Sequence, residues 1–175
     1  MAGNNLIGTL PSSLLSLPLL FFLNVSANNF QGRTEELFLN FSGSPLAIVD
    51  MSHNAFSGSL SHSLFLHDKL TVVRLSDNCI SGSLPDSLCS AVNLTALALD
   101  GVGSASVCSK SYGPLFKIKT YSRGLHGTIP DCVWRLPRLS VLFLPGNQLS
   151  GTLGDIPDDS SSLRHRNLLL QYQFQ

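Results

Sequence analysis

The chain has 175 residues, of which 43% are hydrophobic and 13% charged, with 11 Lys and Arg balanced by 11 Asp and Glu. The hydrophobic content excludes general disorder, and the length suffices for one domain with a core. Zero net charge argues against nucleic acid or an anionic membrane as the partner, because both require a basic face. No uninterrupted apolar run reaches the roughly 18 residues of a membrane span, so none is predicted.

A glycine between apolar residues recurs along the chain, first in Leu6-Ile7-Gly8-Thr9-Leu10. The glycines of this motif stand at 8, 32, 58, 82, 127 and 151, with spacings of 24, 26, 24, 45 and 24. A period of 24 explains the series if one repeat is two residues longer and another carries an insertion of 21 residues. Self-similarity at such a period is typical of a repeat protein.

Each glycine motif follows a segment in which apolar residues alternate with other residues. The segments predict strands near 22–26, 48–52, 72–76, 96–100 and 141–145, with alternate side chains inward and outward. The residues expected to face inward are Leu20, Leu23 and Val25; Leu46, Val49 and Met51; Leu70, Val73 and Leu75; Leu94, Leu97 and Leu99; Leu139, Leu142 and Leu144. Stacked from coil to coil, these side chains would form a core that no single repeat could bury.

An asparagine stands two residues before the apolar residue that opens five of the six glycine motifs. These are Asn4, Asn28, Asn54, Asn78 and Asn147, and the sixth position holds Arg123. An asparagine amide at the end of a strand can satisfy backbone groups inside the coil. We therefore expect the five side chains to form a structural ladder, and Pro11, Pro85 and Pro130 to open the return segments.

This pattern resembles the plant-type leucine-rich repeat, L-x-x-L-x-L-x-x-N-x-L-x-G-x-I-P, found in ectodomains of receptor-like proteins and receptor-like kinases. The resemblance covers residues 4 to about 153. It implies a leucine-rich repeat solenoid, an α/β-type superhelix with a parallel sheet on its concave face. A short second sheet and irregular or 3-10 convex returns would complete each coil. We expect about six repeats over 1–153, the first one partial, and a non-repeat tail over 154–175.

The ends of the chain depart from the repeat. The apolar stretch 14–25 has no basic segment before it and fits the repeat, so a signal peptide is not expected there. Because the chain begins inside a repeat, we expect it to be part of a longer protein with an export signal and a capping segment. Residues 154–175 lose the period and are interpreted as a frayed tail or, alternatively, as a cap over the end of the core.

The 21-residue insertion falls within 100–123 and is expected to protrude as a loop, either functional or merely tolerated. Cys108 lies in it, and Cys89 and Cys132 lie on adjacent coils once it is looped out. A bridge from Cys108 to Cys89 or Cys132 would tether the insertion, although four cysteines allow three connectivities. For Cys79 the simplest interpretation is a buried free thiol. The cysteine spacing does not favour a metal site.

Three N-glycosylation sequons occur, at Asn24, Asn40 and Asn93. Single sequons are common by chance, but with the cysteines and the low charge they favour the secretory pathway. Asn24 would lie on the concave sheet, so Asn40 and Asn93 are the preferred sites. We accordingly expect an extracellular or cell-surface location.

The outward strand residues form the expected binding surface. The candidate ligand-binding residues are Phe22, Ile48, Asp50, His53, Val72, Arg74, Asp77 and Phe143. Exposed apolar residues on a sheet resemble binding anchors. We expect Asp50 and Arg74, one strand apart, to neutralise each other.

No catalytic constellation, kinase signature or cofactor motif is recognisable, and the histidines are interpreted as solvated. The leading hypothesis is a non-catalytic extracellular recognition module that binds a protein or peptide, a glycan, a small hormone or a co-receptor. The alternatives are a scaffold, wall-associated or intracellular, and an inhibitor of a secreted hydrolase. A signal peptide and membrane span in the full gene would separate the first two, and an inhibition assay would identify the third.

Overall fold

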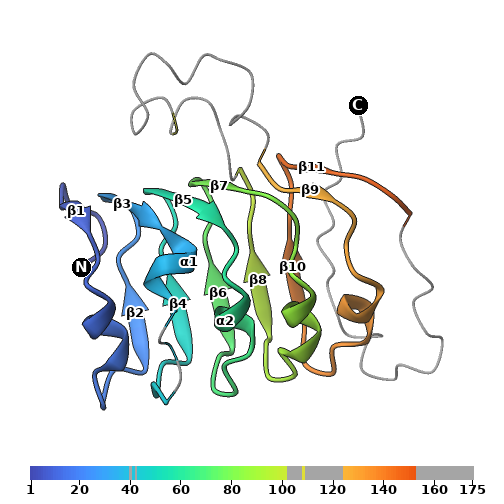
Figure 1. Cartoon of the computed structure of the whole chain (residues 1–175), viewed down its shortest axis with the longest axis horizontal. Coiled ribbons are helices and arrows are strands. Elements are labelled where there is room, and N and C mark those ends of the chain that lie inside the picture. The colour runs from blue at the N-terminus through green and yellow to red at the C-terminus, as the bar shows by residue number, and fades with distance from the viewer. Residues whose placement is uncertain (40, 42, 102–107, 109–123, 153–175) are drawn as a thin grey trace.

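The structure is a computed structural model that describes residues 1–39, 41, 43–101, 108 and 124–152. The chain winds into successive coils stacked side by side, each with one strand on one long side and one return segment on the opposite side (Figure 1). The predicted leucine-rich repeat solenoid is confirmed. The expected boundary between the repeats and the tail lies outside the described residues and stays a prediction.

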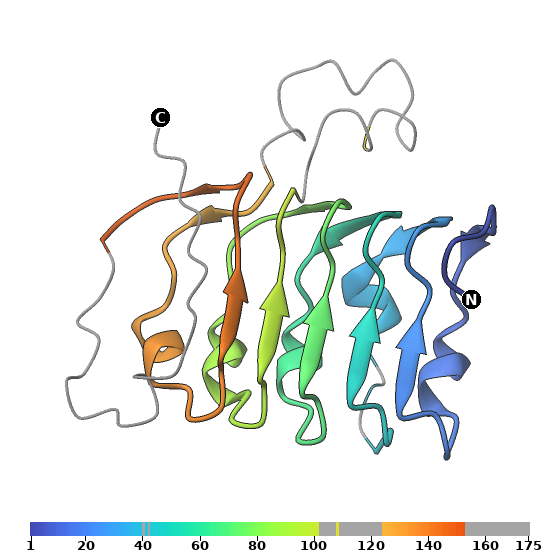
Figure 2. The same cartoon turned by 180° about the vertical axis from the view of Figure 1, so that it is seen from behind.

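Five parallel strands form the first sheet, in the order β10-β8-β6-β4-β2 (Figure 2). They are β2 (Phe22–Asn24), β4 (Ile48–Asp50), β6 (Val72–Arg74), β8 (Ala96–Ala98) and β10 (Val141–Phe143). All five predicted strands are present, but each has three residues rather than five. Hydrogen bonds between coils continue past the strand ends, as from Ala27 N to Ser52 O at 2.9 Å. We call the outward side of this sheet the strand face.

The glycine motifs form a second set of parallel strands, as predicted. One sheet has the order β1-β3-β5-β7, and β9 pairs with β11 in another. An isolated parallel bridge between Gly82 and Leu125 joins the two. The strands are β1 (Ile7–Thr9), β3 (Asn29–Arg33), β5 (Ala55–Ser59), β7 (Cys79–Ser81), β9 (His126–Gly127) and β11 (Gln148–Leu149).

The return segments are of two kinds, and proline separates them. The 3-10 helices η1 (Ser12–Ser16), η2 (Asp86–Ser90) and η4 (Asp131–Arg135) each follow a proline at the N-cap. The coils without that proline form one-turn α-helices, α1 (Thr34–Leu37) and α2 (His62–Phe65). The expectation of irregular or 3-10 returns is thus wrong for these two coils.

The core runs through the stack as one continuous cluster of apolar side chains. The residues predicted to face inward are buried, except Leu20 in the first coil, which is partly buried. Phe30 and Phe56 stack in neighbouring coils, with ring centroids 6.4 Å apart. Each coil buries these positions against its neighbours, so a single 24-residue unit is stable only as part of an array.

Two disulfides join neighbouring parts of the stack. Cys89–Cys132 links η2 to η4, with Cα atoms 5.4 Å apart. The second bridge is Cys79–Cys108, with Cα atoms 5.2 Å apart. The prediction that Cys108 pairs with Cys89 or Cys132 is therefore wrong, and so is the interpretation of Cys79 as a free thiol.

The chain path explains this pairing. Asp77 N donates to Asp100 O at 2.9 Å, so the insertion leaves the array directly beside the segment that leads into Cys79. Cys89 and Cys132 instead lie in return segments, away from that exit. The period showed which coils carry cysteines, but not on which side of its coil each one lies.

Candidate binding face

The asparagine ladder lies just after the C-terminal ends of the strands and joins neighbouring coils by hydrogen bonds. Asn54 Oδ1 accepts from Phe30 N at 3.0 Å, and its Nδ2 donates to the carbonyls of Val25, Met51 and Ser52 at 3.0–3.1 Å. Asn28, Asn78 and Asn147 make the same type of contacts with their own neighbours. The predicted ladder is present at these four positions.

Asn4 departs from this pattern, because its Nδ2 donates to Met1 O and Ala2 O within its own coil.

The residue before each ladder asparagine adopts a left-handed backbone. The φ values are +52° at Ala27, +55° at His53 and +50° at Asp77. Glycine fills the equivalent positions at 3 and 146. This conformation costs a residue with a Cβ about 1–2 kcal/mol relative to glycine, so three coils carry strain at the same place.

Two predicted ligand-binding residues, His53 and Asp77, occupy these left-handed positions. The turn carries them to the rim above the strands, where His53 Nδ1 lies 2.9 Å from Asp77 Oδ2. Ser76, next to this pair in sequence, bonds Asp100 instead, so no Ser–His–Asp relay forms here. His53 and Asp77 therefore belong to the rim and not to the strand face itself.

The strand face carries a row of apolar side chains, one from each strand. Phe22, Ile48, Val72, Ala96 and Val141 are neighbours in the register of the sheet. Phe22 and Val141, at the two ends, are 45% and 41% exposed, and the three between them are half-buried. We call these five residues the apolar row. Because the strands lie about 4.8 Å apart, the row spans roughly 19 Å.

A second row, two residues later in each strand, is polar at one end and apolar at the other. It comprises Asn24, Asp50, Arg74, Ala98 and Phe143. Arg74 Nη1 lies 3.6 Å from Asp50 Oδ2, so the expected neutralisation across the ladder is confirmed. Phe143, on the edge strand β10, is half-buried.

Asp50, one of the candidate ligand-binding residues, is largely buried, and its role in binding stays a prediction. Only 9% of Asp50 is exposed, and its Oδ1 accepts from Ser52 N at 3.1 Å. Asn24 Oδ1 likewise accepts from Ser26 N at 3.0 Å. These short side chains fold back to close the turn after the strand, so Asp50 is chiefly structural while Arg74 remains available at the surface.

His67 corrects the interpretation that the histidines are solvated. It is 8% exposed, and its ring lies 4.3 Å from that of Phe41. Nε2 donates to Ser44 O at 2.9 Å while Nδ1 accepts from Lys69 N at 3.3 Å. Burial lowers the pKa of His67 more than the bond to the Ser44 carbonyl raises it, which favours the neutral ring.

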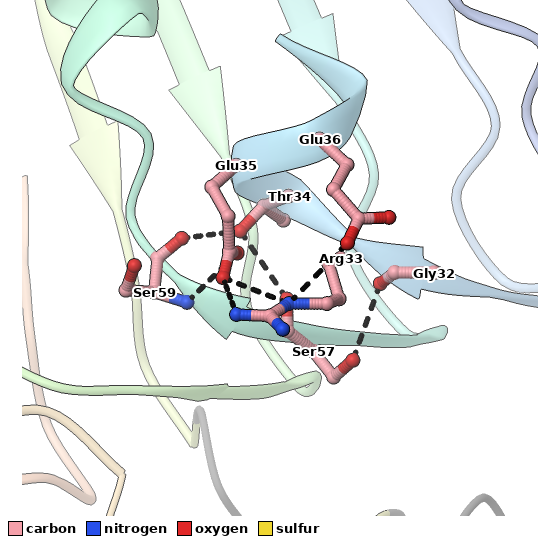
Figure 3. Close-up of polar contacts among 7 residues, drawn as sticks. All are labelled: Gly32, Arg33, Thr34, Glu35, Glu36, Ser57 and Ser59. Atoms are coloured by element: carbon pink, nitrogen blue, oxygen red, sulfur yellow. Dashed lines mark hydrogen bonds and ion pairs between the residues drawn. The ribbon is translucent and has the colours of Figure 1, made fainter. Parts of the chain in front are cut away.

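A polar cluster on the second sheet was not predicted. Glu35 bonds Arg33, and its Oε2 accepts from Ser59 N at 3.1 Å, across one coil (Figure 3). Although burial raises the pKa of Glu35, the hydrogen bonds from its own backbone, Arg33 and Ser59 N and the Arg33 charge lower it below its usual value. Hollows of about 230 and 480 Å³ flank Arg33. They lie over the second sheet, away from the strand face.

The remaining predicted residues fall in different places. Asn93 is half-buried in the turn before β8. Asn40 and most of the 100–123 insertion lie outside the described residues. Within the described ranges, no group of three or more His, Cys, Asp or Glu side chains could hold a metal ion. None of the helices found in those ranges is long and apolar enough to cross a bilayer.

Comparison with known proteins begins with a family model described as Leucine Rich Repeat, which matches residues 69–91. No curated protein matches the chain.

Several solved structures share the fold. One is the ectodomain of the Arabidopsis receptor kinase HAESA in complex with an IDA peptide hormone ligand, with a TM-score of 0.68 and 26% identity over 86% of this chain and 21% of that chain. A TDR receptor has a TM-score of 0.65 and 25% identity over 85% of this chain and 22% of its own. For the BIR3–SERK2 complex of Arabidopsis thaliana the TM-score is 0.60, with 25% identity over 86% and 68%. The chain thus spans about a fifth of HAESA and TDR.

Proposed function

We propose that this chain, a leucine-rich repeat solenoid similar to ectodomains of plant receptor kinases, is an extracellular recognition module that binds a peptide or protein partner through the strand face. The observation that carries the proposal is the apolar row. Its side chains are not needed for the core, because the inward side chains of the same strands are already fully buried. Their exposure has a cost in solubility that a partner would remove.

The chemistry of the face favours an extended ligand. Apolar side chains at a constant spacing suit a chain that runs across the strands and places its own apolar groups along the row. Arg74 stands beside Val72 in the middle of the array, and more than half of its side chain is exposed. Its guanidinium has donors to spare for a carbonyl or carboxylate of the ligand, because Asp50 engages it at one nitrogen only.

The similar structures support this class of partner. The HAESA ectodomain was solved with a peptide hormone, and BIR3 was solved in complex with SERK2. These partners belong to those proteins, and for this chain a peptide or a second ectodomain is part of the proposal. No enzymatic activity is proposed.

The test removes the centre of the apolar row. A random peptide library is panned against the immobilised chain, and a selected peptide is titrated against the unmodified protein and the Ile48→Ser, Val72→Ser double variant. Ile48 and Val72 are half-buried, so the double variant should lose some stability, and a thermal melt must show that it is folded at the temperature of the titration. Affinity should fall about 10- to 100-fold if both residues are anchors.

The matched control is the double variant Leu39→Ser, Leu66→Ser, which replaces two exposed apolar residues outside the strand face. It should bind the peptide like the unmodified chain. Equal affinity for all three proteins, or a library that yields no binder, would contradict the proposal.

A further inference from the structure

The turn that leads into β8 carries the sequon Asn93-Leu94-Thr95. Asn93 Nδ2 donates to Asp68 O at 2.8 Å, in the equivalent turn of the preceding coil. Both turns lie before the strands, at the end of the coil opposite the left-handed rim. A group attached to Asn93 would therefore project from the edge of the stack where the strands begin, and it would leave the apolar row open.

Two exposed apolar side chains belong to this turn and to the equivalent turn of the preceding coil. Val92 is 51% exposed and immediately precedes Asn93, and Leu66 is 55% exposed at the end of α2. The helices α2 and η2, which lead into the two turns, pack against each other in adjacent coils. The only charged pair at the edge of these two turns in the described residues is Asp68–Lys69, at 3.0 Å. An apolar edge with so few charges would favour self-association.

We propose that Asn93 carries an N-linked glycan and that this glycan covers Leu66 and Val92. In the transfer, Asn93 Nδ2 attacks the anomeric carbon of an oligosaccharide held as a lipid-linked diphosphate. The new C–N bond replaces the C–O bond to the diphosphate, which leaves with the bonding electron pair, and Nδ2 loses one proton. The substrate class is thus a lipid-linked oligosaccharide, and the modifying enzyme is an oligosaccharyltransferase of the secretory pathway.

The folded geometry is compatible with the modified side chain. A glycosylated amide keeps one N–H, so the bond from Nδ2 to Asp68 O can persist. The Thr95 hydroxyl, which the enzyme must recognise, is engaged in the fold by donating to Thr71 O at 2.9 Å. We therefore expect the transfer to occur before this coil has closed.

The sequon at Asn24 differs in its surroundings. Asn24 lies in β2 on the strand face, paired in register with Asp50 and two residues after Phe22. A glycan there would cover the start of the apolar row, whereas a glycan at Asn93 would not.

The first experiment measures occupancy on the full 175-residue chain secreted from plant cells. Treatment with a glycan-releasing amidase in heavy-oxygen water converts a glycosylated asparagine to labelled aspartate, which peptide mass spectrometry then locates. We expect the label at Asn93, and its loss in the Thr95→Val variant. Thr95→Ser should keep the label because it keeps a sequon, and Thr71→Val should keep it because it alters only the hydroxyl ladder. Unlabelled Asn93 in the secreted protein would overturn the proposal.

The second experiment tests whether the glycan covers the apolar edge. Asn93→Gln should self-associate more strongly than the glycosylated chain and bind several-fold more of an apolar fluorescent dye. Adding Leu66→Ser and Val92→Ser to Asn93→Gln should reverse both effects. Equal dye binding with and without the glycan would overturn the covering role. Neither readout depends on the peptide titration, so this proposal and the proposed function can fail separately.

Discussion

At the scale of single residues, His67 makes the stability of the fold depend on pH. Its ring is held by hydrogen bonds with Ser44 O and Lys69 N and packs on Phe41, and it is 8% exposed. Because burial lowers its pKa from the usual 6.5, the folded chain binds a proton at this ring less readily than the unfolded chain does.

The sign of the linkage follows from this difference. Well above pH 6.5, as at pH 7.5, the ring is mostly neutral in both states, and its contribution to stability is present. As the pH falls below 6.5 the unfolded chain takes up the proton first, so the free energy of unfolding should decrease. Urea denaturation at pH 7.5 and pH 5.5 should show this loss, and His67→Gln should reduce it. Parallel pH dependence in the two proteins would contradict the assignment.

At the scale of elements, one glycine of the second sheet is constrained by a neighbouring coil. Gly58 in β5 has a φ of +85°, and a Cβ there would lie 2.0 Å from Glu35 Oε2. Gly82 has a φ of +97°, but a Cβ there would meet its nearest atom, Ser59 Cβ, at 3.6 Å. The carboxylate of Glu35 occupies the space above Gly58 because it bonds Ser59 N and Arg33.

Alanine at these two positions should therefore have unequal effects. Both substitutions place a Cβ in a left-handed backbone and should cost about 1–2 kcal/mol. Gly58→Ala must also displace Glu35, which loses charge-assisted hydrogen bonds and should cost about 1 kcal/mol more. Denaturant unfolding of Gly58→Ala and Gly82→Ala measures the difference. In a Glu35→Ala background the gap should close, and a persisting gap would show that Glu35 is not its cause.

The strands, the inward core and the asparagine ladder could be predicted because each depends on residues that recur in every coil. The exceptions depend on contacts specific to one coil. His67 is buried because the longer second repeat supplies Ser44 and Phe41, and the spacing of 26 marks that repeat without showing where its extra residues pack. Asp50 is buried because it closes its own turn, although alternation correctly placed it outward.

At the scale of the whole molecule, the 100–123 insertion divides the array into two sections. The coils after it contact those before it through pairing of β10 with β8, the bridge from Gly82 to Leu125, and packing of η4 on η2. The disulfide Cys89–Cys132 crosses this junction and closes a long loop of chain. In the chain-entropy account, closing a loop of this size stabilises by about 4 kcal/mol.

Removal of this bridge should loosen the last coils selectively. In the Cys89→Ser, Cys132→Ser variant we expect amide hydrogen exchange to rise over residues 124–149 more than over 22–74, because contacts in a solenoid are made only with neighbouring coils. Mass spectrometry of exchanged peptides measures both regions. The Cys79→Ser, Cys108→Ser variant controls for the loss of a disulfide as such. A uniform rise across all coils would indicate a single cooperative unit.

Where the insertion begins and where it ends, the chain is fastened to almost the same point. Gly101 N donates to Pro145 O at 3.0 Å, and Leu125 N donates to Asn147 Oδ1 at 3.1 Å. With its two ends pinned to acceptors only two residues apart, a segment here can lengthen or shorten without shifting the coils, since each doubling of a flexible loop costs only about 0.6 kcal/mol. The junction is therefore a position at which one inserted segment can be exchanged for another while the register of the stack is preserved.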